Sequence, residues 1–133
     1  MTPDQLNEFA ARYTTAWNAH DAAAAAACYA ESGSLAINGG EPAQSRAAVQ
    51  AVVQSFCDAF PDAVLTMDFV RGAGDRAIYG WTYEGTNTGP DGTGHRVRFS
   101  GWEAWTFSPE GLVGQSLGNF EADEYGRQLA EGV

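Results

Sequence analysis

The stretch that decides the fold is FSGWEAWTF, residues 99–107. If it forms a β-strand, successive side chains point to opposite faces of a sheet. One face then carries large aromatic residues around a single acid, in the order Phe99, Gly101, Glu103, Trp105 and Phe107. An ionised carboxylate among aromatic rings is costly unless it is paired or hydrogen-bonded. The strand therefore predicts a buried sheet face and a special role for Glu103.

Other segments of the second half of the chain share this two-residue period. Together with the first stretch they predict strands over residues 63–72, 75–86, 94–108 and 111–122, and a shorter strand over 33–39 precedes them. Sequences rich in Gly, Pro, Asn and Asp separate the four long strands, at residues 72–75, 87–94 and 109–111. Short turns of this kind join neighbouring antiparallel strands, so a meander is expected.

The first half of the chain has helical periodicity instead. Helices are predicted over residues 2–21, 21–30 and 46–60, with a short one at 123–132. Thr2, Asp21 and Ser45 are placed as N-caps of the first three helices, and Pro61 stops the third. Helices followed by a meander indicate an α+β fold, in which a curved antiparallel sheet wraps around three N-terminal helices. At 133 residues the chain is expected to form one domain over residues 1–133.

The composition excludes several classes of function. The formal net charge is −10, from 17 acidic and 7 basic residues. That charge argues against binding to nucleic acid or to an anionic membrane. The two histidines and the cysteines Cys28 and Cys57, both expected in helices, lack metal-ligand spacing, so no metal and no cofactor is expected. With no leader-like N-terminus and no long apolar run, the protein is expected to be cytoplasmic with free, buried thiols.

Aromatic side chains with polar tips are unusually frequent on the predicted inner face. A sheet curved around helices can leave a cone-shaped cavity, and such side chains suit its lining. Ordinary core packing is the alternative for each ring. The candidates are Tyr13, Trp17, Tyr79, Trp81, Phe99 and Trp105.

Four segments in sequence order resemble a known family. They are FAARYTTAWNAHD (9–21), SRAAVQAVVQSF (45–56), TNTGPDGTGHRVRFSG (86–101) and EGLVGQSLGNFEADEYGRQL (110–129). This arrangement resembles the SnoaL-like and ketosteroid-isomerase-like proteins of the nuclear-transport-factor-2-like superfamily. The resemblance extends from about Leu6 to Leu129. It implies a cystatin-like cone with a hydrophobic pocket, often in a homodimer, and a hydrophobic small molecule as ligand.

The resemblance to the ketosteroid isomerases implies roles for two residues. Their first helix carries an RY pair and then an NAxD turn, which match Arg12-Tyr13 and residues 18–21. The tyrosine of that pair donates a hydrogen bond to an enolate oxygen, which places Tyr13 in that role. Their fourth strand carries a protonated acid that gives the second donor, and Glu103 matches it. The alternatives for Glu103 are an ion pair with Arg96 or Arg98, or exposure at a dimer interface.

The chain departs from the family at the positions of other titratable groups. The isomerase base position holds Ile37, with Asn38 beside it. In the polyketide cyclases a histidine and an acid match Trp105 and Asn119. Glu121, on the same predicted strand face as Asn119, is the expected base, and Asp123 is its reserve. Gln115, Leu117 and Asn38 are added to the predicted ligand contacts.

Two classes of function follow from these residues. The first is a cofactor-independent isomerase, cyclase or dehydratase that acts on a hydrophobic carbonyl compound by enolate stabilisation and acid/base chemistry. The second is a non-catalytic module of the same fold that binds an apolar ligand or dimerises. A homodimer is expected through the outer sheet face, because Trp102 lies opposite Glu103 in the strand alternation.

Overall fold

The computed structural model describes residues 1–133, with strands and helices in the predicted order. The helices are α1 (Pro3–Asn18), α2 (Ala22–Ala26), α3 (Arg46–Ala59) and α4 (Ala122–Glu131). The strands are β1 (Tyr29–Ile37), β2 (Ala43–Gln44), β3 (Val64–Ala73), β4 (Arg76–Thr86), β5 (Arg96–Phe107) and β6 (Val113–Phe120). The predicted α+β fold is confirmed.

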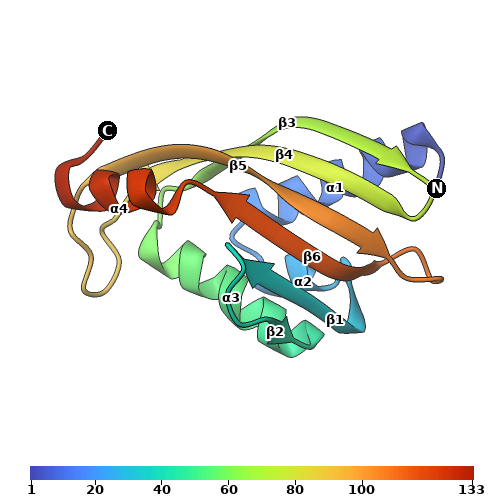
Figure 1. Ribbon diagram of the computed structural model, residues 1–133. Coiled ribbons are helices and arrows are strands. Elements are labelled where there is room, and N and C mark those ends of the chain that lie inside the picture. The colour runs from blue at the N-terminus through green and yellow to red at the C-terminus, as the bar shows by residue number, and fades with distance from the viewer.

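The six strands form one curved sheet in the order β2-β1-β6-β5-β4-β3. Figure 1 shows the sheet arching over the helices, with β5 and β6 near its centre. Four of the five strand pairs are antiparallel, as predicted. The pair β1–β6 is parallel, so the sheet is mixed and not wholly antiparallel as the sequence predicted. A parallel pair needs a crossover connection, and here the chain between β1 and β6 includes α3 and three long strands.

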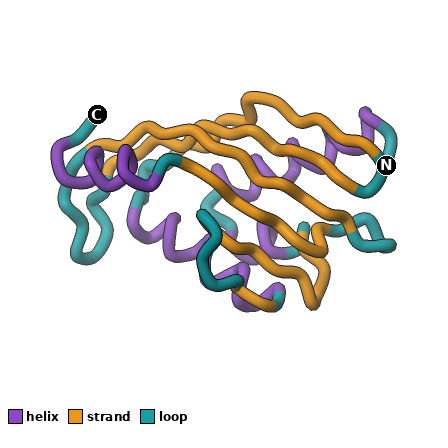
Figure 2. The backbone as a smooth tube through the Cα atoms, viewed as in Figure 1, coloured by secondary structure: helices purple, strands orange, loops and turns teal.

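The three N-terminal helices lie on one side of the sheet (Figure 2). Their starts follow from local hydrogen bonds to the predicted caps, since the side chains of Thr2, Asp21 and Ser45 accept from backbone N–H groups three residues on. An N-cap of this type satisfies one of the free N–H groups of the first turn. Helix α3 ends at Ala59, two residues before Pro61. The capping pattern read from the sequence is therefore confirmed.

The second helix is shorter than its alanine run suggested. It ends at Ala26, Cys28 lies in the following turn, and Tyr29 begins β1. Cys28 is therefore not helical, which corrects its predicted placement. Both Cys28 and Cys57 are buried free thiols.

A β-bulge in β6 sets which side chains of that strand face the helices. Phe107 pairs with Val113, but the next pair is Thr106 with Gln115, so Gly114 is an extra residue. An extra residue reverses the alternation of a strand. Val113 and Ser116 therefore both point into the core, where each is fully buried. Gln115 points to solvent.

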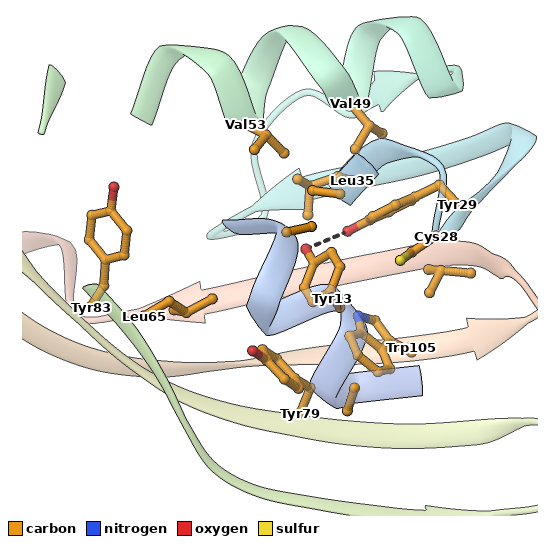
Figure 3. Close-up of a cluster of buried hydrophobic side chains, with 14 of the residues drawn as sticks. Tyr13, Cys28, Tyr29, Leu35, Val49, Val53, Leu65, Tyr79, Tyr83 and Trp105 are labelled. Carbon is orange, nitrogen blue, oxygen red and sulfur yellow. Dashed lines mark hydrogen bonds between the residues drawn. The ribbon is translucent and has the colours of Figure 1, made fainter. Parts of the chain in front are cut away.

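The core is aromatic in its centre. The ring of Tyr79 stacks on Trp105 with centroids 4.9 Å apart, and Tyr13 meets both rings edge-on. Figure 3 shows these three side chains packed between α1 and the sheet. Edge-to-face and stacked contacts of this kind add to the burial of the rings. They fix the surroundings of Glu103 on the same sheet face.

Candidate functional site

Glu103 lies at the centre of a buried cluster of hydrogen-bond donors. Its side chain on β5 is 8% exposed. Oε1 accepts from Ser116 Oγ at 2.7 Å, Tyr29 Oη at 3.0 Å and Trp105 Nε1 at 3.1 Å. The Tyr13 hydroxyl faces both oxygens, at 3.0 Å from Oε2 and 3.1 Å from Oε1. The carboxyl group that is costly to bury among aromatic rings is therefore hydrogen-bonded at both of its oxygens.

The four donors come from four elements: Tyr13 from α1, Tyr29 from β1, Trp105 from β5 and Ser116 from β6. Each supplies one hydrogen atom, and an ionised carboxylate has about four acceptor sites. All four donors lie within hydrogen-bond distance of Oε1, whereas Tyr13 alone reaches Oε2. Oε2 thus keeps spare acceptor capacity.

The two phenols are held in the protonated, donating form. Burial raises the pKa of Tyr13 well above its ordinary value, and the charge of Glu103 raises it further. The same two causes raise the pKa of Tyr29. Their oxygens also lie 3.2 Å apart, in the contact drawn in Figure 3. Both therefore serve Glu103 as donors over the whole range of physiological pH.

An apolar cavity of about 70 Å³ opens beside this cluster. Ten of its twelve lining residues are hydrophobic, and Glu103 is the one residue of the lining with a carboxyl group. The lining comprises Trp17, Leu35, Ile37, Val52, Phe56, Leu65, Trp81, Tyr83, Phe99, Glu103, Gly118 and Phe120. A mostly apolar pocket with one placed polar group is the usual form of a small-molecule site.

Gly118 forms part of the wall next to Glu103. A Cβ atom added there would meet only Ala36 O at 3.6 Å and side-chain carbons of Ile37 and Glu103 at 3.9 Å. These are ordinary contact distances, so the backbone does not require glycine at this position. A glycine in a strand interior can mark a place where a ligand approaches closely. Here it leaves this part of the cavity wall without a side chain.

The indole nitrogen of Trp17 is the one buried side-chain nitrogen or oxygen without a hydrogen-bond partner. Trp17 lies on α1, one turn after Tyr13, and its ring centroid is 6.4 Å from that of Tyr13. Among the causes acting on the Tyr13 phenol, burial and the charge of Glu103 raise its pKa, whereas the Trp17 N–H group lowers it. The N–H is therefore near the Tyr13 hydroxyl, although the two make no hydrogen bond.

The predicted aromatic lining divides into two groups. Trp17, Trp81 and Phe99 line the cavity, as expected. Tyr79 and Trp105 do not, because they stack on each other in the core. Trp105 nevertheless reaches the site through its N–H group.

The residues predicted on the pocket side of the last strand lie elsewhere. Gln115, Leu117 and Asn119 occupy the outer face of β6, and Glu121 is the exposed N-cap of α4. The bulge at Gly114 is the physical reason, because it turns Ser116, Gly118 and Phe120 inward instead. The expectation that Glu121 or its reserve Asp123, also exposed, faces the cavity is therefore wrong.

Asn38 also lies outside the cavity. It has a φ of 52° in the turn after β1, and its Oδ1 accepts from the backbone N–H of Phe120 at 2.9 Å. This hydrogen bond joins the turn after β1 to the end of β6. Its neighbour Ile37, at the isomerase base position, does line the cavity.

The ion-pair alternative for Glu103 is not realised. Arg96 and Arg98 both approach Glu84, at 3.5 Å each, on the outer face. Glu103 points to the opposite face and has no cationic partner. The convergence of Tyr13 with Glu103 is as the resemblance implied, but Tyr13 donates to the carboxylate and does not line the cavity.

Three functional candidates were missed from the sequence: Tyr29, Ser116 and Gly118. Tyr29 follows the alanine run and was assigned to a helix, although its aromatic ring favours a strand. In a regular strand without a bulge, Ser116 and Gly118 would lie on the outer face and Leu117 on the inner face. Only the pairing of β6 with β5 reveals the bulge that turns them inward.

A curved sheet and helices that enclose a buried acid and an apolar cavity are typical of proteins that bind a small molecule in an internal pocket. The sequence profile of the SnoaL-like domain matches residues 10–114, and the chain belongs to this family. No curated protein matches it at a significant level. None of the helices has the length and apolar character that a membrane crossing requires.

Solved structures share the fold over nearly the whole chain. TsrD from Streptomyces laurentii is 19% identical, with a TM-score of 0.85 and 97% of each chain covered. A putative SnoaL-like polyketide cyclase from Jannaschia sp. CCS1 is 12% identical, with a TM-score of 0.84, covering 100% of this chain and 98% of that one. The epoxide hydrolase/cyclase-like enzyme SalBIII is 20% identical, with a TM-score of 0.78, covering 93% and 97%. At these identities the likeness establishes the shared fold.

Proposed function

We propose that this protein is an enzyme that moves a proton on a small hydrophobic carbonyl compound, in a reaction of the isomerase, cyclase or dehydratase type. The observation that carries the proposal is the position of Glu103. Glu103 is the one residue with a carboxyl group that lines the apolar cavity, and four donors fix the orientation of that group. The names of the cyclase-like proteins of the same fold support an enzymatic role.

Glu103 acts as the general base in this proposal. The four surrounding donors supply hydrogen bonds of the kind that a carboxylate accepts, and Oε2 has room for one more. This differs from the protonated donor of the ketosteroid isomerases. Oε2, with one donor at 3.0 Å, is the oxygen that takes the substrate proton.

The proposed chemistry needs one carboxylate and no cofactor. Oε2 removes a proton from the carbon next to the carbonyl, and the electron pair of that C–H bond moves to give an enolate. The protonated Glu103 then returns the proton to another atom of the substrate, which restores the carboxylate. An isomerisation uses only these two steps. In a cyclase the enolate carbon attacks a second carbonyl carbon, and the alkoxide formed takes the proton from Glu103. In a dehydratase a hydroxyl group departs from the enolate and takes that proton to leave as water.

Tyr13, Tyr29, Trp105 and Ser116 are positioning residues in this scheme. They hold the carboxylate in one orientation and offset the cost of its burial. Trp17, Trp81 and Phe99 provide apolar contact for the ligand. The enclosed space is small for a drug-sized ligand, which fills several hundred Å³. The reacting part of the substrate is therefore compact, and a larger substrate extends through the mouth.

Ligand binding without catalysis is the second candidate. It is favoured by one observation: the lining contains no second carboxyl group and no lysine, arginine, histidine or cysteine. A reaction that needs two separate titratable groups has no second group there. The test below separates these two candidates.

Exchange of carbon-bound hydrogen for deuterium tests the proposal without knowledge of the natural substrate. Acetophenone in D₂O, followed by proton NMR, reports removal of its methyl protons next to the carbonyl. The wild type is expected to accelerate this exchange over buffer, and Glu103→Gln is expected to abolish the acceleration. Glu121→Gln, which alters an exposed acid outside the cavity, is the matched control and should exchange like the wild type. Binding of acetophenone without exchange would favour the non-catalytic candidate.

A further inference from the structure

Glu103 is the one buried acidic residue of the chain, and no basic residue forms an ion pair with it. Its hydrogen-bond partners are uncharged groups of Tyr13, Tyr29, Trp105 and Ser116. Buried charged groups in proteins are usually paired with an opposite charge or with a metal ion. The ionised Glu103 of the proposed function is therefore an anion that receives no counter-ion from the protein.

The arginines of the chain do not reach the cavity. All 7 basic residues are arginines, and none of them is among the lining residues. Arg46 donates from Nε to the backbone carbonyl of Tyr29, and Arg96 and Arg98 approach Glu84 on the outer face. The formal net charge of −10 attracts cations and raises their concentration near the protein. A counter-ion for Glu103 is therefore expected to come from a ligand.

The wall of the cavity carries aromatic rings in two groups. Within each group every ring contacts the other two, with centroids 5.1–6.2 Å apart and steep angles between the ring planes. Tyr83 and Phe99 join the groups, with centroids 5.9 Å apart. The face of an aromatic ring attracts a cation within about 6 Å of its centroid. The aromatic cage, as we call these six lining residues, comprises Trp17, Phe56, Tyr83, Trp81, Phe99 and Phe120.

We infer that the cavity binds a tertiary or quaternary alkylammonium group, with Glu103 as its counter-ion and the aromatic cage around its methyl groups. This goes beyond the proposed function and shares with it the ionised form of Glu103. An alkylammonium group has a compact apolar surface and few or no N–H groups, so its burial leaves few donors unsatisfied. A hard metal cation needs several oxygen ligands, whereas the lining contains one carboxyl group.

Two ligands of equal shape isolate the contribution of the positive charge. Choline and 3,3-dimethylbutan-1-ol differ only in a charged nitrogen against a neutral carbon. Titration calorimetry at low salt measures both affinities. The wild type is expected to bind choline about tenfold more tightly, because only choline gains the attraction of the carboxylate and of the ring faces.

Two variants that each remove one negative charge show where the preference arises. In Glu103→Gln the ratio of the two affinities should fall to about twofold, the part that ring faces alone supply. Glu121→Gln is the matched control, because it changes the net charge equally at an exposed residue that does not line the cavity. The ratio should stay at about tenfold in this control. Comparing ratios removes any effect of the variant that both ligands share.

The proton NMR signal of the choline methyl groups tests the aromatic cage in the wild type, without any variant that has to fold. Protons above a ring face are shielded, so this signal should move upfield when the protein is added. Saturation of the aromatic protons of the protein should also transfer to the methyl groups. A downfield shift would place ring edges around the ligand, and would overturn the role of the aromatic cage.

The outcomes separate this inference from the proposed function. Failure of choline to bind, equal affinity of the two ligands for the wild type, or an unchanged ratio in Glu103→Gln overturns the inference. An equal fall of the ratio in Glu121→Gln also overturns it, since the preference would then come from the overall charge. Glu103-dependent exchange of acetophenone would still stand in those cases. Glu103-dependent preference for choline without such exchange supports the inference and counts against the proposed function.

Discussion

Ser116 Oγ lies 2.7 Å from Glu103 Oε1, and the serine is fully buried. The contact joins β6 to β5 across the inner face of the sheet, and it exists because the bulge at Gly114 turns Ser116 inward. A hydroxyl in this place has no solvent to bond with. Its one hydrogen is therefore committed to the carboxylate.

Ser116→Ala should lower the free energy of unfolding by about 1–3 kcal/mol. It removes a buried hydrogen bond to a charged group and leaves Oε1 with one donor fewer. Denaturant unfolding measures the change. Ser55→Ala, at an exposed helix position, is the control and should stay within about 0.5 kcal/mol of the wild type. A loss no larger than that of the control would show that Ser116 does not stabilise the carboxylate.

Gly118→Ala and Gly118→Val should close the approach to Glu103 in two graded steps. An added Cβ makes only ordinary contacts there, so the folded state is retained. Thermal unfolding should show little loss, while binding of acetophenone should weaken with Ala and be lost with Val. Gly101→Val is the contrasting variant, because its Cβ would overlap the carbonyl oxygen of Asn119. Undiminished binding in Gly118→Val would place the ligand elsewhere.

Much of the fold can be predicted from local sequence because local interactions determine it. The caps at Thr2, Asp21 and Ser45 act over three residues, and strand alternation places Glu103 opposite Trp102 without any knowledge of the partner strands. The meeting of Tyr13 with Glu103 followed from a family resemblance, since 90 residues separate them. The resemblance did not predict that Tyr13 donates its hydrogen to Glu103.

The remaining features depend on interactions between distant segments. The parallel pairing of β1 with β6 joins residues about 80 positions apart in the chain, as in Ser34 with Gln115. The bulge at Gly114 is visible only as a shift in pairing with β5. One inserted residue reverses the inward and outward faces. That is why Asn119 and Glu121 were expected in the cavity that Gly118 lines.

The tyrosines should resist ionisation until the protein unfolds. Burial raises the pKa of Tyr13, Tyr29, Tyr79, Tyr83 and Tyr125, which are all five tyrosines of the chain. In the unfolded chain a phenol has a pKa of about 10. Because the folded state holds these protons more tightly, this contribution to stability is complete below about pH 10 and is lost as the pH rises further.

Absorbance of phenolate against pH, with circular dichroism in parallel, measures this effect. Ionisation of most tyrosines should coincide with loss of the folded signal, well above pH 10. A set of phenols that titrates near pH 10 in the folded protein would contradict the burial of these side chains.

The outer face of the sheet is expected to form a homodimer. Trp102 is 46% exposed and Leu117 is 43% exposed, and both lie on that face together with the exposed Ile78. Clustered apolar side chains on a sheet face favour association. Sedimentation at micromolar concentration should give a dimer for the wild type and a monomer for Trp102→Glu combined with Leu117→Glu. The control Val133→Glu alters an exposed residue at the C-terminus and should leave the dimer intact. A monomeric wild type would refute the assignment.

The protonation state of Glu103 in the folded protein tests the central claim most directly. Infrared difference spectra between the wild type and Glu103→Gln at neutral pH isolate the bands of this one side chain. The hydrogen-bond count around the carboxyl group predicts the paired stretching bands of an ionised carboxylate. Those bands should respond when acetophenone binds, since Glu103 is one of the residues that line the ligand cavity. The carbonyl band of a protonated acid would contradict this account, and would assign Glu103 the donor role of the ketosteroid isomerases.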